Sequence, residues 1–252
     1  MLLAIDVGNT TTVLGLFEGD ELMRSYRVKT DAASTADEIR LTFRGLLADD
    51  PDVTGIALCS TVPAVLREMR TMLVRYYDHV PHVIIEPGAR TGVPVLMDNP
   101  KEVGADRIAN TLAAHTLYGG PCVVVDFGTS TNFDVVSAKG EFLGGALAPG
   151  IEISLEALAS RAAQLRKVEF VAPRSVIAKN TVEALQSGAL YGFAGQVDGI
   201  VTRIIAELGE PVTAVIATGG LASVVIRESS TVTVHRPDLT LQGLRMVYER
   251  NV

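Results

Sequence analysis

The sequence predicts an α/β protein built from two related domains, because one short motif occurs twice in a chain of 252 residues. The apolar segments 2–5 and 122–125 each run into a polar turn, at 6–12 and at 126–131. In both copies the pattern predicts a strand, a turn, a second strand, a second turn and a third strand. Self-similarity at such a separation indicates a duplicated domain rather than a solenoid. The matching residues, each 120 positions apart, are Asp6 and Asp126, Gly8 and Gly128, Thr11 and Thr131, and Glu21 and Glu141.

Composition and charge exclude several classes of protein. Hydrophobic residues make up 48% of the chain and charged residues 20%, which is typical of a globular protein with a sizeable core. The formal net charge of −7 gives no basic footprint for nucleic acid or an anionic membrane, and no window is apolar enough to span a bilayer. Cys59 and Cys122 lie in apolar, strand-like segments and are expected to be buried structural thiols. We therefore expect a cytoplasmic protein that binds neither nucleic acid nor membrane.

The first domain is expected over residues 1–118. Ser34 or Thr35 caps one expected helix, with acidic residues in its first turn, and Pro63 is suited to the first turn of the next. A third helix opens at Gly104. The expected strands are 2–5, 13–17, 22–30, 55–60 and 83–86, and the expected helices begin near residues 35, 63 and 104.

Three basic residues occur along one expected strand of this domain. Arg24, Arg27 and Lys29 alternate with other residues in the segment 22–30. Charged side chains in a strand mostly point to solvent. We expect these three to form one solvated face.

The second domain is expected over residues 119–252. Its helical pattern at 181–208 predicts either two helices or one helix with a break near Gly192 or Gly195. The last segment, 239–248, is an amphipathic helix able to pack back across the domain boundary. The other expected elements are strands at 122–125, 133–137, 142–147 and 212–218 and a helix at 153–165.

The residue types in the two turns suit phosphate binding. A carboxylate that ends a buried strand is costly unless a cation or several donors use it, and Gly8 lets the backbone approach a ligand closely. The first turn alone fits equally well an ordinary hairpin turn whose side chains bond their own backbone. The second copy favours two turns that hold one polyphosphate from both sides of a cleft. Gly219-Gly220, after a buried strand, allows a similar close approach, although an ordinary tight turn explains it too.

These motifs together resemble the acetate kinase, sugar kinase, Hsp70 and actin superfamily, and more closely the type III pantothenate kinases. Any one of them is weak, but they occur in the family's order over nearly the whole chain. The residues that carry the resemblance are Asp6-Val7-Gly8-Asn9-Thr10, Asn99-Pro100, Val103-Gly104-Ala105-Asp106-Arg107, Asp126-Phe127-Gly128-Thr129, Gly144-Gly145, Pro149-Gly150, Asn180-Thr181 and Thr218-Gly219-Gly220.

The resemblance implies two duplicated ribonuclease H-like domains of the actin-like ATPase type, each a mixed sheet flanked by helices. It implies ATP-dependent phosphorylation of pantothenate to 4'-phosphopantothenate, the first step of coenzyme A biosynthesis. ATP with Mg²⁺ and a monovalent cation, K⁺ or NH₄⁺, are the implied cofactors. A homodimer is also implied, because Thr181 of such enzymes contacts substrate bound by the neighbouring subunit.

By the same resemblance each motif has a role. Asp106 accepts the proton of the substrate hydroxyl, Asp126 holds the monovalent cation, and Asp6 positions Mg²⁺ through the phosphates. The ATP-binding residues are Asp6, Val7, Gly8, Asn9, Thr10, Thr11, Thr12, Val13, Thr129, Gly219 and Gly220. The pantothenate-binding residues are Met97, Gly104, Ala105, Asp106, Arg107 and Thr181. A carboxylate base beside a guanidinium for the pantothenate carboxylate is what this chemistry requires.

Some positions depart from the family's pattern. Met97 stands where a Tyr is common, Ser130 where Ala is usual, and Ala178-Lys179 where Gly-Arg is frequent. Met97 keeps open a kinase of another small hydroxyl substrate. A catalytically silent, nucleotide-binding regulator is a further alternative, against which the presence of both Asp106 and Asp126 argues.

Overall fold

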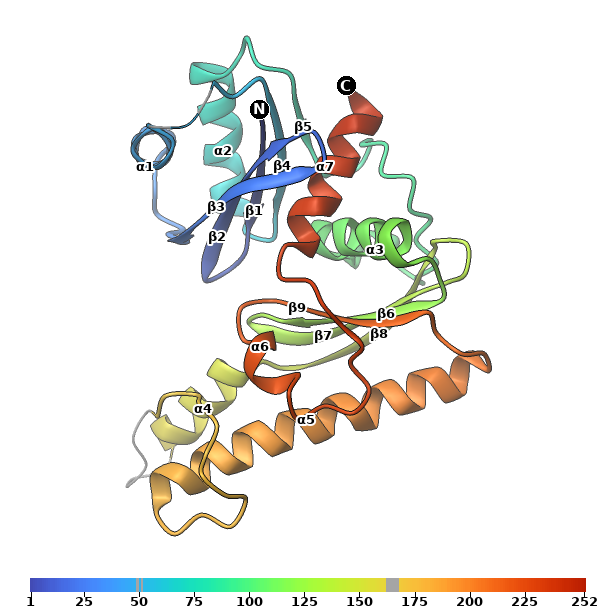
Figure 1. The fold of residues 1–252 in the computed structure, drawn as a ribbon. Coiled ribbons are helices and arrows are strands. Elements are labelled where there is room, and N and C mark those ends of the chain that lie inside the picture. Colours follow the sequence, from blue (N-terminus) through green and yellow to red (C-terminus); the bar gives the residue numbers. More distant parts are fainter. Residues whose placement is uncertain (49, 51, 162–167) are drawn as a thin grey trace. The chain divides into compact units, whose positions relative to one another are not determined.

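A computed structural model describes residues 1–48, 50, 52–161 and 168–252 (Figure 1). The chain forms two compact units. Unit 1 comprises residues 1–93, 99–113 and 239–252, and unit 2 comprises residues 94–98 and 114–238. Both units are therefore discontinuous in sequence, and the domain boundary expected near residue 118 stays a prediction.

Unit 1 is built on a mixed five-stranded sheet with the order β3-β2-β1-β4-β5. The first three strands are antiparallel, as the sequence predicts, whereas β4 runs parallel to β1 and β5 runs parallel to β4. This arrangement brings the end of β1 beside the end of β4. The strands are β1 (Leu2–Val7), β2 (Thr11–Glu18), β3 (Glu21–Lys29), β4 (Gly55–Ser60) and β5 (His82–Ile84).

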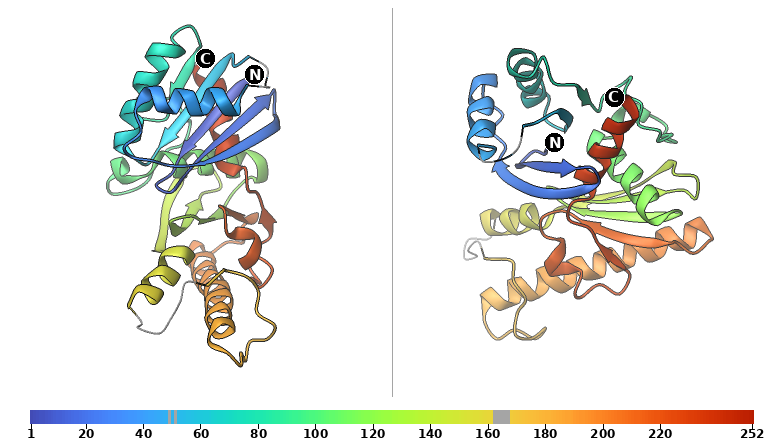
Figure 2. Two further views of the ribbon diagram at one scale, coloured as in Figure 1. Left: turned by 90° about the vertical axis from the view of Figure 1, so that its left-hand side faces the viewer. Right: turned by 45° about the horizontal axis from the view of Figure 1, so that its top comes forward.

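One face of this sheet packs against helices α1 (Ala36–Leu46) and α2 (Pro63–Tyr76) (Figure 2). Leu3 and Leu58 from the sheet, Phe43 from α1 and Met69 from α2 belong to one buried apolar cluster. Burial of such side chains is worth about 1.5–3 kcal/mol each, so this face supplies much of the stability of unit 1.

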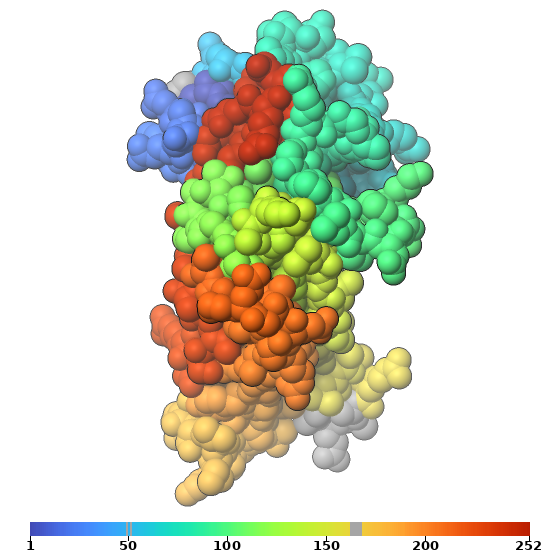
Figure 3. All heavy atoms as spheres, turned by 90° about the vertical axis from the view of Figure 1, so that its right-hand side faces the viewer, coloured from blue at the N-terminus to red at the C-terminus, as the bar shows by residue number. Residues whose placement is uncertain are grey.

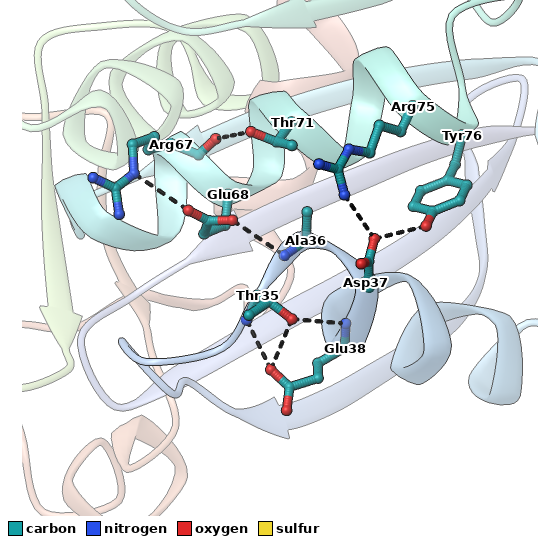
Figure 4. Close-up of polar contacts among 9 residues, drawn as sticks. All are labelled: Thr35, Ala36, Asp37, Glu38, Arg67, Glu68, Thr71, Arg75 and Tyr76. Atoms are coloured by element: carbon teal, nitrogen blue, oxygen red, sulfur yellow. Dashed lines mark hydrogen bonds and ion pairs between the residues drawn. The ribbon is translucent and has the colours of Figure 1, made fainter.

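The start of α1 is fixed by a capping box. The Thr35 hydroxyl accepts from the Glu38 amide, and the Glu38 carboxylate accepts from the Thr35 amide (Figure 4). Asp37 then accepts hydrogen bonds from the Tyr76 hydroxyl, at 2.6 Å, and from Arg75, both near the end of α2. Of the two cap residues that the sequence allows, the structure selects Thr35.

The opposite face of the sheet packs against the carboxy-terminal helix α7 (Leu239–Asn251). A Cβ atom added to Gly15 would lie 2.8 Å from Leu241 Cδ1, and one added to Gly55 would lie 2.3 Å from the Tyr248 hydroxyl. In the space-filling view α7, in red, lies beside the teal segment that precedes residue 94 (Figure 3). The expected packing of the last helix against the first sheet is thus observed within unit 1.

The expectation that Arg24, Arg27 and Lys29 share one face is wrong. Strand side chains alternate between faces, so Arg24, three residues from Arg27, points to the other side. Arg24 and Tyr26 both bond the Asp50 carboxylate, at 2.8 and 2.7 Å, on the side of the buried apolar cluster. Only Arg27 and Lys29 share the face of Asp6.

Unit 2 repeats the architecture of unit 1. Its mixed sheet has the order β10-β9-β6-β7-β8, in which β6 is antiparallel to β7 and parallel to β9. The two sheets therefore correspond strand for strand, which confirms the predicted duplication. The strands are β6 (Cys122–Phe127), β7 (Ser130–Val136), β8 (Phe142–Pro149), β9 (Ala214–Thr218) and β10 (Val234–His235).

The equivalence of Thr11 and Thr131, suggested by their separation of 120 residues, does not hold in the structure. Val7 pairs with Thr12, whereas Phe127 pairs with Thr131, so the second hairpin is one residue shorter. Thr131 corresponds structurally to Thr12. The turns remain duplicated, but their loops differ in length.

Among the helices, α5 is a single element, which decides between the alternatives left by the sequence. It begins at Thr181, after the Asn180 cap, and ends at Leu208 before Gly209 in the left-handed conformation. The predicted extension of α4 beyond residue 161 falls on residues outside those described. The remaining helical elements are the 3₁₀ turn η1 (Pro100–Glu102), α3 (Ala105–Tyr118), α4 (Ile151–Arg161) and α6 (Ala222–Val225).

Within the part of the chain that the structure describes, none of the helices is both long and apolar enough to cross a bilayer.

Close packing of α7 inside unit 1 gives a first prediction. A Cβ at Gly243 would lie 2.1 Å from the Ala109 carbonyl oxygen, and a backbone atom cannot move aside easily. We expect Gly243→Ala to lower the free energy of unfolding by roughly 1–3 kcal/mol, measured by urea denaturation.

Gly45→Ala in the exposed part of α1 is the matched control, because nothing lies within 4 Å of a Cβ there. It is expected to raise the stability by roughly 0.5–1 kcal/mol. Equal denaturation midpoints for the two variants would contradict this account of α7.

Candidate active site

The first turn follows directly from β1. Gly8 donates from its amide to the Thr11 carbonyl oxygen at 3.1 Å, which closes the hairpin and leaves Asn9 and Thr10 exposed. The Thr30 amide bonds the Thr10 carbonyl at 2.9 Å and fixes the loop against the end of β3. The turn thus presents neutral polar groups on a fixed backbone.

Thr12 lies differently from its neighbours in this turn. Its side chain is 3% exposed, and its hydroxyl shares a hydrogen bond of 2.9 Å with the hydroxyl of Thr30. Thr11 and Val13, on the other face of the strand, are partly exposed. Thr12 is one of the residues assigned to ATP by resemblance, but its side chain is buried and stabilises the turn through Thr30.

Asp6 ends β1 next to Cys59 on β4, its partner in the parallel pair. The fully buried Cys59 thiol donates to Asp6 Oδ1 at 3.2 Å. Burial, followed by the nearby negative charge of Asp106, raises the pKa of Asp6 to about 7, against smaller opposing effects of Cys59 and Arg27. Without a cation nearby, ionisation of both Asp6 and Asp106 is therefore unfavourable.

Asp106 lies in the first turn of α3, where the amides of Arg107 and Ile108 bond the Gly104 carbonyl oxygen. Burial raises its pKa, and a backbone hydrogen bond from Arg107 and the Arg107 charge oppose the rise. Its Oδ1 atom is buried and has no hydrogen-bond partner among the described residues. An unsatisfied buried carboxylate oxygen is costly and is available to accept a proton from a ligand hydroxyl.

Gly104 shapes the space around this carboxylate. A Cβ at Gly104 would lie 2.4 Å from Asp106 Oδ1. Any side chain at this position would therefore fill the place where a ligand hydroxyl could reach the carboxylate. Of the predicted substrate residues, Gly104, Ala105, Asp106 and Arg107 are contiguous at the start of α3, and all belong to unit 1.

In unit 2 the second turn lies beside the glycine pair that follows β9. Gly219 has φ +91°, and a Cβ there would lie 2.6 Å from both Asp126 Oδ1 and the Phe127 carbonyl oxygen. Gly150 donates to the Thr129 carbonyl oxygen at 3.1 Å. The structure therefore places Gly219 against Asp126, two of the residues predicted to bind the nucleotide or the monovalent cation, and Gly150 against Thr129, a third.

Met97 is held at the edge of the same sheet. Leu96 donates to the Phe142 carbonyl oxygen and Phe142 donates to that of Pro94, both at 2.8 Å, so the segment 94–96 pairs with β8. A Cβ at Gly144 would lie 3.1 Å from the Met97 sulfur, and Gly144 has φ +114°. Glycine at this position therefore makes room for the Met97 side chain.

Thr181 is the first residue of α5 and is exposed. The preceding Asn180 caps the helix by accepting from the Glu183 amide at 2.9 Å. Within its own chain, Thr181 belongs to unit 2, like Met97, whereas the contiguous substrate residues of α3 belong to unit 1.

Sequence reasoning missed two of the residues that act on Asp6. Cys59, expected to be only a structural thiol, donates to the carboxylate, and the Arg27 charge opposes the rise of its pKa. Both contacts depend on which strands are neighbours. One signal for Cys59 was present in the sequence: like Asp6, it lies near the end of a buried strand.

The donor set fits a magnesium ion held together with phosphates. Mg²⁺ in nucleotide enzymes is usually bound through one or two carboxylates plus substrate phosphates. Asp6 supplies such oxygen atoms, and the described residues contain no cluster of three or more His, Cys, Asp or Glu side chains suited to an all-protein metal site.

Comparison with solved structures gives the fold first. A putative N-acetylmannosamine kinase from Listeria monocytogenes aligns over 99% of this chain and 98% of its own, with a TM-score of 0.57 and 15% identity. A ROK hexokinase from Thermus thermophilus aligns over 98% and 97%, with a TM-score of 0.54. A putative Baf family transcriptional activator from Campylobacter jejuni gives a TM-score of 0.60 at 17% identity, covering 98% of both chains. The fold is therefore the duplicated ribonuclease H-like fold of actin-like ATPases and sugar kinases.

Sequence comparison then gives the family. The family model for type III pantothenate kinases matches residues 2–203. The type III pantothenate kinase of Salinispora arenicola is 69% identical over 253 residues, which cover all of both chains, and that of Acidothermus cellulolyticus is 67% identical over 256 residues, which cover all of this chain and 99% of its own. The chain belongs to the type III pantothenate kinase family.

The raised pKa of Asp6 predicts how stability depends on pH. A carboxyl whose folded-state pKa is about 7 rather than 3.8 stabilises the fold below its unfolded pKa, and this contribution is lost as pH rises through 7. Without divalent cations, we expect the wild-type chain to lose about 1 kcal/mol relative to Asp6→Asn between about pH 6 and about pH 8.5. Urea denaturation of both chains in EDTA measures the difference.

Asp37→Asn is the control for this measurement. Hydrogen bonds from Tyr76, followed by opposing desolvation and by Arg75, leave the pKa of Asp37 below its ordinary value, so its ionisation does not change over this range. Parallel pH profiles for wild type and Asp6→Asn would show that Asp6 is ionised throughout.

Proposed function

We propose that the chain phosphorylates the terminal hydroxyl of pantothenate with ATP and produces 4'-phosphopantothenate, the first step of coenzyme A biosynthesis. The observation that carries the proposal is the Asp106 carboxylate at the start of α3, with a buried oxygen that has no partner among the described residues and with Asp6 close by. Membership of the type III pantothenate kinase family supports the choice of substrate and phosphoryl donor.

Asp106 accepts the proton of the substrate hydroxyl as that oxygen attacks the γ-phosphorus of ATP. Burial raises the pKa of this carboxyl, which brings it nearer to the working pH of a general base. Arg107 pairs with the pantothenate carboxylate, because a guanidinium binds a carboxylate through two hydrogen bonds. Gly104 and Ala105 leave room for the bound substrate.

The nucleotide is bound by the residues that the family resemblance assigns to it. Asp6 holds Mg²⁺, which neutralises developing charge on the phosphates. The first turn supplies neutral donors from Gly8 to Thr11, and Thr129, Gly219 and Gly220 are the remaining ATP-binding residues. Asp126 holds K⁺ or NH₄⁺, the role that the family resemblance implies.

The active form is a homodimer, and an exposed apolar surface around Thr181 supports this assignment. The surface comes from α4, the segment 168–180 and the first turn of α5, which lie together at one end of unit 2 (Figures 1 and 2). Exposed large apolar side chains on neighbouring elements are typical of an interface. Its residues are Ile153, Leu158, Val171, Val176, Ile177 and Val182.

We also assign the protein to the cytoplasm. Cys59 and Cys122 are both buried and unbridged, which suits a reducing compartment. ATP and pantothenate are then the small-molecule partners, with no role for nucleic acid or a membrane.

Steady-state phosphorylation of pantothenate tests the proposed function. We expect turnover with Mg-ATP that requires K⁺ or NH₄⁺ and falls when Na⁺ replaces them. Asp106→Asn should lose roughly 10²-fold or more of kcat, because the amide cannot accept the proton, while ATP still binds. Initial rates and calorimetric ATP binding give both quantities.

A wild-type rate for Asp106→Asn would remove this residue from the mechanism. No turnover of pantothenate by a folded, ATP-binding chain would favour another small hydroxyl substrate. In that case Met97→Tyr, which restores the side chain common in the family, is the variant to assay next.

The dimer assignment predicts the effect of a charge at Ile177, whose side chain is 81% exposed. We expect Ile177→Lys to fold normally but to shift the protein toward monomer, because the ammonium group would be buried in the interface. The KM for pantothenate should rise as the protein dissociates, since the substrate contact from Thr181 of the neighbouring subunit is lost. Sedimentation velocity and initial rates measure the two effects.

Val74→Lys is the matched control, because Val74 is exposed on α2 of unit 1 and lies outside the apolar surface. Thr181→Ala should weaken pantothenate binding more than ATP binding while the dimer persists. A wild-type dimer in Ile177→Lys would contradict the proposed interface.

A further inference from the structure

Four side-chain positions form a row across the sheet of unit 1. Cys59 on β4 pairs with Asp6 on β1, Asp6 pairs with Val13 on β2, and Val13 pairs with Arg27 on β3. Residues paired across neighbouring strands point to the same face. Arg27 is thus two strands from Asp6, about 10 Å between backbones, with the Val13 side chain between them.

This row lies near the β1–β2 turn, on the sheet face against which α7 packs. Leu241 of α7 contacts the neighbouring row at Gly15, close enough that a Cβ there would clash. Arg27, in the row of Asp6, is exposed. Lys29, in the next row away from Gly15, is also exposed and pairs with Thr11 of the first turn. Two basic side chains therefore stand on the same face as Asp6, beside the residues of the phosphate turn.

The negative charges at this site favour a positively charged side chain nearby. The negative charge of Asp106 disfavours ionisation of Asp6, and ATP brings several more negative charges. A guanidinium binds phosphate oxygens in a fixed, two-pronged geometry and keeps its charge at any working pH. The Arg27 charge already acts on Asp6, after the larger effects of burial, Asp106 and Cys59 on the pKa of that carboxyl.

We propose that Arg27 binds phosphate oxygens of the nucleotide above Val13, on the side of the phosphates away from Cys59, and that Lys29 adds positive charge next to it. The inference rests on the proposed ATP-dependent function and adds a phosphate-binding residue to it. An anion above Val13 lies between the Arg27 guanidinium and the cation that Asp6 holds, and so meets positive charge on both sides.

Arg24 provides a matched control on the same strand. It lies three residues from Arg27 on the opposite face, where it bonds Asp50 at 2.8 Å. Arg24→Gln and Arg27→Gln therefore make the same chemical change in β3 but on opposite faces of the sheet. Only the second removes charge from the face of Asp6.

Calorimetric titration of the full chain with ATP, ADP and adenosine tests the proposal, each ligand with Mg²⁺ and again in EDTA. For Arg27→Gln we expect affinity for ATP to fall about 10-fold or more, the scale of one charge-assisted hydrogen bond, with a smaller loss for ADP. Adenosine affinity should stay within about twofold of wild type, because adenosine has no phosphate. Arg27→Lys should recover part of the loss, and Arg24→Gln should bind all three ligands as wild type does.

Three outcomes would overturn the inference. One is an equal loss for adenosine and ATP, which would indicate a disturbed fold. Another is a loss seen with Mg²⁺ but absent in EDTA, which would mean that Arg27 acts only through the cation at Asp6. The third is an unchanged ATP affinity. Failure of the wild-type chain to bind ATP is a separate result, which would overturn the proposed function and this inference with it.

Discussion

The site in unit 1 depends on one carboxylate at the end of a buried strand. Desolvation of Asp6, together with the negative charge of Asp106, makes its ionised form unfavourable until positive charge arrives. The Cys59 thiol is a weak donor and offsets little of this cost. In the proposed function, a divalent cation with its bound phosphates would supply the missing charge, and relief of the unfavourable ionisation of Asp6 would then contribute to ligand binding. The fold thus holds the carboxylates of Asp6 and Asp106 in an environment that disfavours their ionised forms.

The duplication uses one sheet order to build two different sites. Asp6 lies beside Cys59 in unit 1, and at the equivalent place Asp126 lies beside Thr218 in unit 2. The next residue in the second copy is Gly219, which packs so closely that a Cβ there would lie 2.6 Å from Asp126 Oδ1. The second copy also has a hairpin shorter by one residue. The first copy keeps a thiol donor and a longer turn.

How much the sequence predicts depends on whether a feature is local. The duplicated strands, the Thr35 cap and the Pro63 helix start follow from short-range patterns and are observed. The contact of Cys59 with Asp6 needs the knowledge that β4 pairs with β1 in one register, which residues 53 positions apart do not reveal. Arg24 and Arg27 look alike in the sequence, yet alternation places them on opposite faces. The family motifs point to Asp106, but only the structure reveals that one of its carboxylate oxygens is buried without a hydrogen-bond partner among the described residues.

A chain with a net charge of −7 that binds a polyanion must create positive potential locally. The first turn presents an exposed loop on a fixed backbone. The remaining need is for full charges, since backbone dipoles alone do not balance a triphosphate facing two carboxylates. A bound cation meets part of that need. The exposed guanidinium of Arg27, on the same face of the sheet and one strand beyond Val13, is placed to meet the rest.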